Sequence, residues 1–365
     1  MAAPVPAGGA KRNVAWDGLR GLAMVMIVAH HAHILPGAVG VIIFYVLSGF
    51  LITATLLREW GRSNHIALGN FYWRRTIRLI PALLLFLTVL AVYSAIAQPL
   101  PVFRQFLNAS FITLFNMANW WQAFHPHEVL GYLNHTWSLS FQEQFYLLWP
   151  LMLLLLLRWN LRRRWIVAVI VGAIAASALV RLFLWQNTHD VMRVFYGSDT
   201  RADGLLVGCL LAFFAHWKVL PNRRAAKMAL RVASIAGALV VLYVEWRVPR
   251  ESDAMFRWFF PLATLAIAAF VWDIYTTTLS RRLAFLEIAP LVWLGQLSYG
   301  VYLWHYPLLR FSIVHGPGGV LGQFLWIVPT LLVSAASYYF LEQPLVNRKH
   351  RKAATPVVLT PQQAA

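Results

Sequence analysis

The chain has 365 residues, of which 60% are hydrophobic and only 12% are charged, and its net charge is +18. A soluble protein of this size needs more polar surface than this composition supplies. The apolar residues also come in long blocks, and a helix needs about 20 mostly apolar residues to cross a bilayer. These features exclude an ordinary soluble domain and indicate a multi-pass protein of a cell membrane.

The apolar blocks predict an all-α, polytopic membrane fold with about ten transmembrane helices. A further apolar segment, 103–124, is interrupted by asparagines and ends in a polar stretch. We interpret it as an external loop that carries an interfacial helix. The ten predicted helices cover residues 17–33, 40–58, 79–98, 137–157, 165–185, 203–217, 231–246, 258–276, 290–311 and 321–341.

The basic residues support this count and predict the orientation. On a soluble protein, a charge of +18 would suggest nucleic acid, but here most of the 31 Lys and Arg residues fall in short loops between apolar blocks. With both termini in the cytoplasm, most of them lie on the inner side, as bacterial membrane proteins prefer. We therefore expect one transmembrane domain over residues 1–347, a short disordered polar tail over 348–365, and no nucleic-acid partner.

Ionisable residues inside predicted spans are functional candidates, because unpaired charge is costly in lipid. Arg20 and His31 lie on the first predicted helix, roughly 16 Å apart along its axis at 1.5 Å per residue. A histidine at this depth is either a hydrogen-bonded core residue or a catalyst. His30 points about 100° away around the helix, so the two neighbouring histidines cannot share a face.

Three charged residues on the third and fourth predicted helices are further candidates. Arg75 and Arg78 are three residues apart and face the same way. Two adjacent guanidiniums suit phosphate groups, although positive-inside anchoring explains such runs equally well. Glu143 lies inside an apolar helix. It either orients a histidine, as carboxylates do in hydrolytic triads, or forms a structural ion pair with an arginine.

We interpret the remaining candidates as contacts to the substrate. Tyr299 and His305 belong to a predicted helix dense in hydroxyls and aromatic rings, which stack on sugars but also mark membrane interfaces. Arg201 and Asp203 begin another helix from outside, as a substrate contact or as an ion-pair clamp. No zinc-ligand spacing, Walker loop or dinucleotide fingerprint occurs, so we predict no metal and no bound cofactor.

These groups, in this order, resemble the family-3 membrane acyltransferases. The resemblance implies transfer of an acyl group, often acetyl, from cytoplasmic acyl-CoA to hydroxyls of surface polysaccharides, lipid-linked sugars or other glycans. The matching stretches are DGLRGLA at 17–23 with His31, FYVLSGFLIT at 44–53, FYWRRTIRLIP at 71–81, the segment 136–150, TRADGLLVG at 200–208, LSYGVYLWHYP at 297–307, and EQP at 342–344.

The family's key residues carry over as His31 and Glu143 for catalysis and as Arg20, Arg75 and Arg78 for acyl-CoA. His31 is expected to act as a general base on the acceptor hydroxyl or to accept the acyl group itself. We expect all the polar groups to converge on one cavity, with His31 and Glu143 on facing helices.

The sequence departs from the family's pattern at two places. Ile42 stands where many members have an acid, and Gln142 replaces one of two usual glutamates in the fourth helix. Any role that needs two carboxylates is therefore in doubt. We also find no fused SGNH hydrolase-like domain, so transfer is expected to be completed alone or with a separate partner.

Three other classes stay open at this stage. A transporter or flippase of a glycan or small molecule also uses intramembrane His, Glu and Arg, although paired broken helices are not evident. A glycan polymerase would have large external loops and no need for inner arginines. A non-catalytic scaffold would not carry so many polar groups in its spans.

Overall fold

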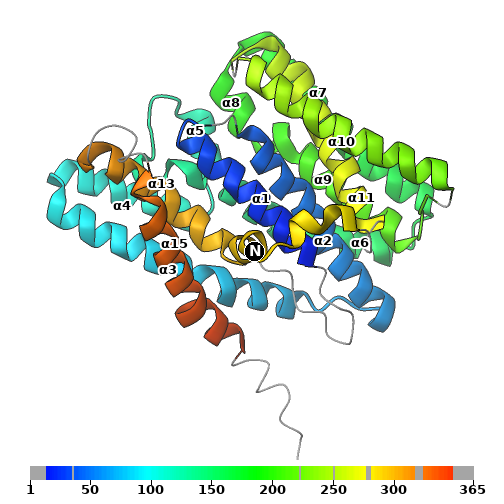
Figure 1. The fold of residues 1–365 in the computed structure, drawn as a ribbon, viewed down its shortest axis with the longest axis horizontal. Coiled ribbons are helices and arrows are strands. Elements are labelled where there is room, and N and C mark those ends of the chain that lie inside the picture. The colour runs from blue at the N-terminus through cyan, green and yellow to red at the C-terminus, as the bar shows by residue number, and fades with distance from the viewer. Residues whose placement is uncertain are drawn as a thin grey trace, which may run out of the picture.

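The computed structural model describes residues 14–34, 37–221, 223–249, 251–276, 281–316 and 324–347, and within these ranges it is helical and has no strand. Helices α1 and α2 lie at the centre of the view, with α3 and α4 on one side and α7 and α10 on the other (Figure 1). The elements are α1 (Val14–His31), α2 (Ala38–Ser63), α3 (Leu68–Ala97), α4 (Leu100–Leu114), α5 (Ala118–Phe124), η1 (Gly131–Thr136), α6 (Trp137–Arg158), α7 (Arg163–Thr188), α8 (Val191–Tyr196), α9 (Ser198–His216), α10 (Arg224–Arg247), η2 (Met255–Phe259), α11 (Phe260–Thr276), η3 (Arg281–Glu287), α12 (Ala289–Gln296), α13 (Ser298–His315), α15 (Ile327–Ala336) and η4 (Ser337–Glu342).

The all-helical fold is confirmed, and every predicted apolar block contains a helix in its described part. Six helical stretches of the described chain are long and apolar enough to span a membrane: α2, α3, η1 with α6, α7, α10, and η2 with α11. The ten-span count and the cytoplasmic termini stay predictions. The predicted tail, 348–365, lies outside the described residues.

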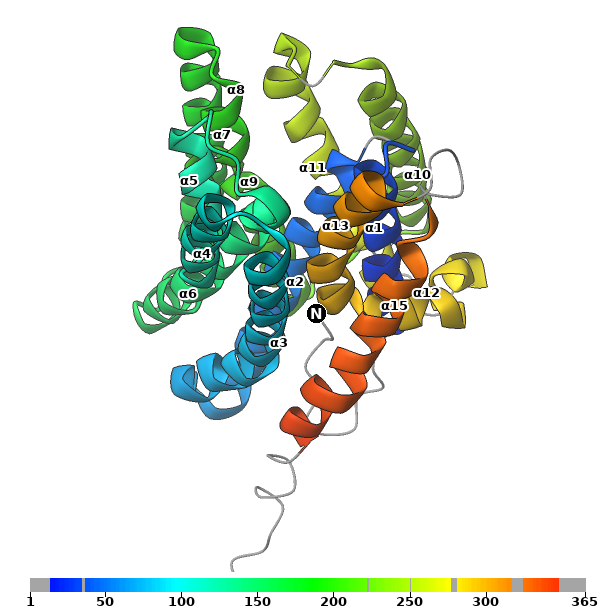
Figure 2. The same cartoon turned by 90° about the vertical axis from the view of Figure 1, so that its left-hand side faces the viewer.

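Two predicted boundaries differ from the structure in ways that affect the site. Helix α3 begins at Leu68 and not at residue 79, so all three arginines of the 71–81 motif lie on the helix itself. The block predicted as one helix over 290–311 is divided at Leu297 into α12 and α13. Figure 2 shows α13 beside α1, and α13 also packs against α15.

The segment expected outside the membrane forms two short helices, α4 and α5. They are separated at Asn116, which has a positive φ of 57°. Helix α4 has 15 residues, a length of roughly 22 Å, whereas the hydrocarbon core is roughly 30 Å thick. This length fits an outer segment that packs on α3 and η1 without spanning the bilayer.

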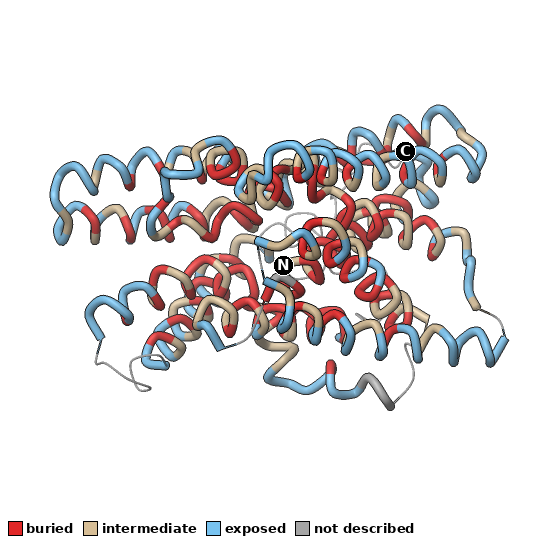
Figure 3. Tube along the Cα trace, turned by 90° about the horizontal axis from the view of Figure 1, so that it is seen from above, coloured by how far each residue is buried: buried red, intermediate tan, exposed pale blue. Residues whose placement is uncertain are grey.

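Burial separates central helices from lipid-facing ones. The most apolar part of α2 is 67% buried inside the protein, whereas the corresponding parts of α7 and α10 are only 22% and 11% buried. Figure 3 shows buried positions on the inward sides of the helices and exposed positions around the outside. Large apolar side chains such as Ile96 and Leu239 are exposed, which lipid tolerates and water would not.

Glycine allows the central helices to approach closely. A Cβ added at Gly49 of α2 would lie 2.0 Å from the Leu205 carbonyl oxygen, and one at Gly208 of α9 would lie 2.1 Å from the Val46 carbonyl oxygen. Small residues are the usual means of packing membrane helices, because apolar side chains gain little over lipid. The α2–α9 interface therefore depends on backbone contact.

Gly208→Ala should destabilise the protein, because its methyl group forces two helix backbones apart at a cost of about 1–3 kcal/mol. The matched control is Gly172→Ala on α7, where an added Cβ meets nothing within 4 Å. Thermal unfolding in detergent should show a lower Tm for Gly208→Ala and an unchanged or slightly higher Tm for Gly172→Ala. Equal Tm values would contradict the close α2–α9 packing.

Topology reporters test the ten-span prediction. A reporter fused after His125, in the outer segment, and a reporter fused to the C-terminus should lie on opposite sides of the membrane. Alkaline phosphatase activity should be high for the first fusion and low for the second. Activity from the same side in both fusions would sink this topology.

Candidate active site

A narrow cavity lies between α1, α2, α3, α6 and α13, in the middle of the bundle. Its volume is about 40 Å³, which by that measure holds roughly three water molecules. The wall includes the predicted residues Arg75, Glu143 and Tyr299, together with apolar residues of α1 and α2.

At the cavity wall, Arg75 and Glu143 form a two-pronged ion pair. Arg75 Nε donates to Glu143 Oε2 at 2.8 Å, and the Arg75 amino group donates to the second carboxylate oxygen. The guanidinium also lies 3.4 Å above the centre of the Tyr146 ring. Of the two interpretations of Glu143, this geometry matches the ion pair with an arginine, and it joins α3 to α6.

His31 and His305 are brought together from opposite ends of the sequence. His31 Nδ1 lies 2.9 Å from His305 Nε2, and His305 Nδ1 lies 2.9 Å from the carbonyl oxygen of Val301. His305 is fully buried and His31 is half-buried. His30 instead packs beside Gly37, where an added Cβ would lie 2.1 Å from the His30 Cβ. The two adjacent histidines therefore occupy different surroundings, as the helix period predicts.

Tyr302 connects the cavity to the histidines. It lines the cavity, and its hydroxyl lies 2.5 Å from Ser138 Oγ and donates to the backbone carbonyl of His135. The His135 ring lies 5.3 Å from the rings of both Tyr302 and His305, centre to centre. The sequence did not single out these residues as candidates. Ser138 and Tyr302 belong to the matching stretches 136–150 and 297–307, and His135 directly precedes the first of these.

The predicted sites thus converge in part. Arg75, Glu143 and Tyr299 share the cavity, and the histidine pair lies next to it through Tyr302. His31 itself is not among the lining residues, but Ile27, one turn earlier on α1, is.

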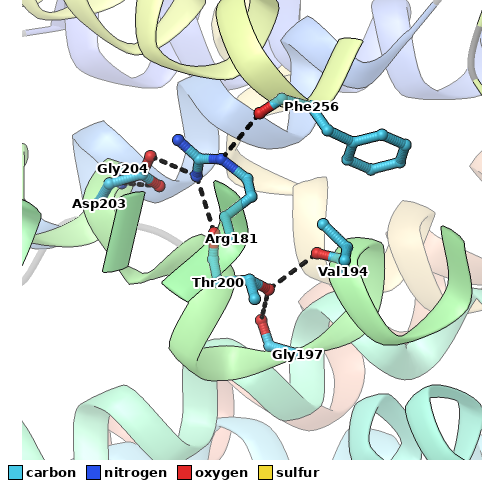
Figure 4. A network of polar contacts seen from close by, with 7 residues as sticks. All are labelled: Arg181, Val194, Gly197, Thr200, Asp203, Gly204 and Phe256. Carbon is cyan, nitrogen blue, oxygen red and sulfur yellow. Dashed lines mark hydrogen bonds and ion pairs between the residues drawn. The ribbon is translucent and has the colours of Figure 1, made fainter. Parts of the chain in front are cut away.

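Arg201 and Asp203 lie in a separate polar group. Asp203 pairs with Arg181 of α7 at 2.7 Å, and Arg181 also donates to the backbone carbonyls of Thr200 and Phe256 (Figure 4). Arg201 lies 3.8 Å above the centre of the Phe260 ring. Asp203 therefore belongs to an ion-pair clamp, and its partner is a single arginine inside an apolar helix that sequence reasoning passed over.

Arg20 and Arg78 also have acidic neighbours. Arg20 pairs with Asp17 at 3.3 Å, three residues earlier on α1, and both side chains are buried. Arg78, one turn along α3 from Arg75, is half-buried and interacts electrostatically with the buried Glu342. Within the described ranges, no group of three or more His, Cys, Asp or Glu side chains has the geometry to hold a metal ion.

The sequence matches the family model for an acyltransferase domain over residues 13–341. The chain belongs to the family-3 membrane acyltransferases. This acyltransferase is accordingly a multi-pass membrane protein. No solved structure matches the chain.

Curated bacterial relatives are longer than this acyltransferase. It is 33% identical to the peptidoglycan O-acetyltransferase OatA of Listeria monocytogenes over 90% of this chain and 55% of the relative. It is 31% identical to the O-acetyltransferase OatA of Staphylococcus aureus, over 92% of this chain and 57% of the relative. A putative peptidoglycan O-acetyltransferase of Bacillus subtilis, YrhL, is 31% identical over 94% of this chain and 56% of the relative. The chain thus spans little more than half the length of these relatives.

Breaking the Arg75–Glu143 pair on one side should lower stability. Arg75→Met leaves a carboxylate without its cation, and Glu143→Leu leaves the reverse, each at a cost on the order of 3 kcal/mol. The double variant, which removes both charges, should unfold at a higher temperature than either single variant. Strictly additive losses of Tm would show that the two side chains do not depend on each other.

Proposed function

We propose that this acyltransferase moves an acyl group from acyl-CoA to a hydroxyl of a cell-envelope glycan. The observation that carries the proposal is the hydrogen-bonded pair of His31 and His305 beside a cavity in the middle of the bundle. Peptidoglycan is the first acceptor to test, because relatives at 31–33% identity are named for it. Since those proteins are much longer, the acceptor here is part of the proposal.

In this mechanism His31 acts as the general base. It removes the proton of the acceptor hydroxyl, and the oxygen attacks the thioester carbonyl. The new C–O bond forms, the C–S bond breaks, and the thiolate of CoA takes the proton from the imidazolium. An acyl-histidine intermediate is the alternative course, and it would appear as an acyl mass on the peptide that contains His31.

We place the acyl-CoA donor on the inner side of the cavity. The guanidinium of Arg75 is already engaged by Glu143, which leaves it as a fixed wall beside the acyl chain. Arg78 continues the same face of α3, so we assign the donor's phosphates to Arg78, with Arg20 as a neighbouring cation. The pantetheine arm then points from Arg78 toward Tyr302 and the histidines.

A transporter is the weaker reading of the same polar groups. The family model that matches residues 13–341 describes an acyltransferase domain. Arg201 and Tyr299 stay candidates for acceptor contact, although Arg201 lies in the separate polar group near Phe260.

His31→Ala should abolish acyl transfer while the protein stays folded and inserted. Loss of a general base costs on the order of 10²–10⁴-fold in rate. His30→Ala is the matched control, because that neighbour does not share the bond to His305, and it should retain most activity. Both variants need turnover per folded molecule, measured with purified protein. Normal turnover by His31→Ala would remove His31 from the chemistry.

Arg78→Lys should weaken use of acyl-CoA. Lysine keeps the charge but cannot offer the planar fork that binds two phosphate oxygens. The KM for acyl-CoA should rise by roughly tenfold, about the 1.4 kcal/mol that one charge-assisted hydrogen bond contributes. Arg74→Lys, on the exposed neighbouring residue, is the control and should leave KM unchanged. The same KM in both variants would reduce Arg78 to an orientation signal.

A further inference from the structure

We propose that His305 is a positioning residue that sets the tautomer of His31. In this arrangement His31 carries its proton on Nδ1, and the lone pair lies on Nε2, which is then the reacting nitrogen. The inference rests on the proposed function of His31 as a base or nucleophile. It assigns a role to a residue that sequence reasoning had placed only in acceptor binding.

His305 forms a hydrogen bond with the main chain of its own helix. His305 Nδ1 lies 2.9 Å from the carbonyl oxygen of Val301, four residues earlier on α13. A carbonyl oxygen only accepts hydrogen bonds, so Nδ1 of His305 must carry a proton. In a neutral imidazole the other nitrogen, Nε2, is then an acceptor. The main chain of α13 therefore determines which nitrogen of His305 can receive a proton.

The bond to His305 in turn determines the tautomer of His31. The acceptor nitrogen of His305 lies 2.9 Å from Nδ1 of His31. An acceptor at that distance requires a donor, so the proton of His31 is on Nδ1. Its lone pair is consequently on Nε2. The opposite tautomer of His31 would set two lone pairs against each other and break the bond.

His305 is held rigidly enough to enforce this tautomer of His31. Its side chain has no exposed surface. The rings of His31, His135 and Tyr302 pack around it, with their centres 5.0–5.5 Å from its own. When His31 takes a proton on Nε2, its Nδ1–H still donates to His305, so one hydrogen bond serves both protonation states. A buried polar network with fixed partners specifies one arrangement in this way.

Nuclear magnetic resonance of protein labelled with ¹⁵N-histidine tests the assignment directly. The two tautomers differ in which nitrogen is protonated. Variants that each replace one histidine assign the His31 signals. We expect a protonated Nδ1 and a bare Nε2 for His31 in the unaltered protein. In His305→Leu this preference should be lost. His33→Asn, at an exposed residue with positive φ, is the control and should leave the His31 signals unchanged.

Kinetics provide the second measurement. The turnover number of His305→Leu should fall on the order of 10–100-fold, the usual effect of removing a partner that orients a reacting group, with KM for acyl-CoA unchanged. His305→Gln places an amide oxygen near the former Nε2 and should recover part of the turnover and of the Nδ1–H signal. If His305→Leu does not fold, the unaltered protein and His305→Gln still decide.

The outcomes separate this inference from the proposed function. A proton on Nε2 of His31 in the unaltered protein, or a tautomer of His31 in His305→Leu that is the same as in the unaltered protein, would overturn the inference even if acyl transfer is normal. The predicted tautomer without transfer to any envelope glycan would instead refute the proposed function and leave the assignment of His31 standing.

Discussion

Charge that is surrounded by lipid has to find its partner inside the protein, and this constraint organises the structure. Arg75 of α3 meets Glu143 of α6, and Arg181 of α7 meets Asp203 of α9. Each pair connects two different helices, and removing one member would leave an uncompensated charge at depth. Because apolar side chains distinguish poorly between lipid and a neighbouring helix, these pairs supply much of the specificity of helix pairing.

The same constraint explains one departure from the family's pattern. Gln142 replaces an acid next to Glu143 and lines the cavity with it. One guanidinium then faces one carboxylate, and the cavity wall is electrically balanced without a second cation. The carboxylate forms an ion pair, and in our proposed mechanism the chemistry belongs to the two histidines joined by a hydrogen bond. Tyr302 connects the cavity with the histidines.

The helices could be predicted from the sequence, because apolar blocks of spanning length have few other solutions. The candidate residues could also be found, since charge inside such blocks is conspicuous. The partners could not be predicted. His31 and His305 are 274 positions apart, and Glu143 could have met either a histidine or an arginine. Arg181 was passed over because a single arginine in an apolar helix carries no motif. The early start of α3 was missed because its first turns are polar and aromatic, and the break at Leu297 because the block is apolar on both sides.

In our proposal, one chain transfers the acyl group of acyl-CoA, bound on one side of the bundle, to a hydroxyl of a glycan. The most direct measurement uses sealed membrane vesicles that contain the protein, with acyl-CoA carrying a ¹³C-labelled acyl group supplied at the cytoplasmic face. Mass spectrometry of the envelope glycans should find the labelled ester, with one free CoA released for each ester formed. Release of CoA without a labelled glycan, or movement of an unmodified glycan across the membrane, would contradict the account.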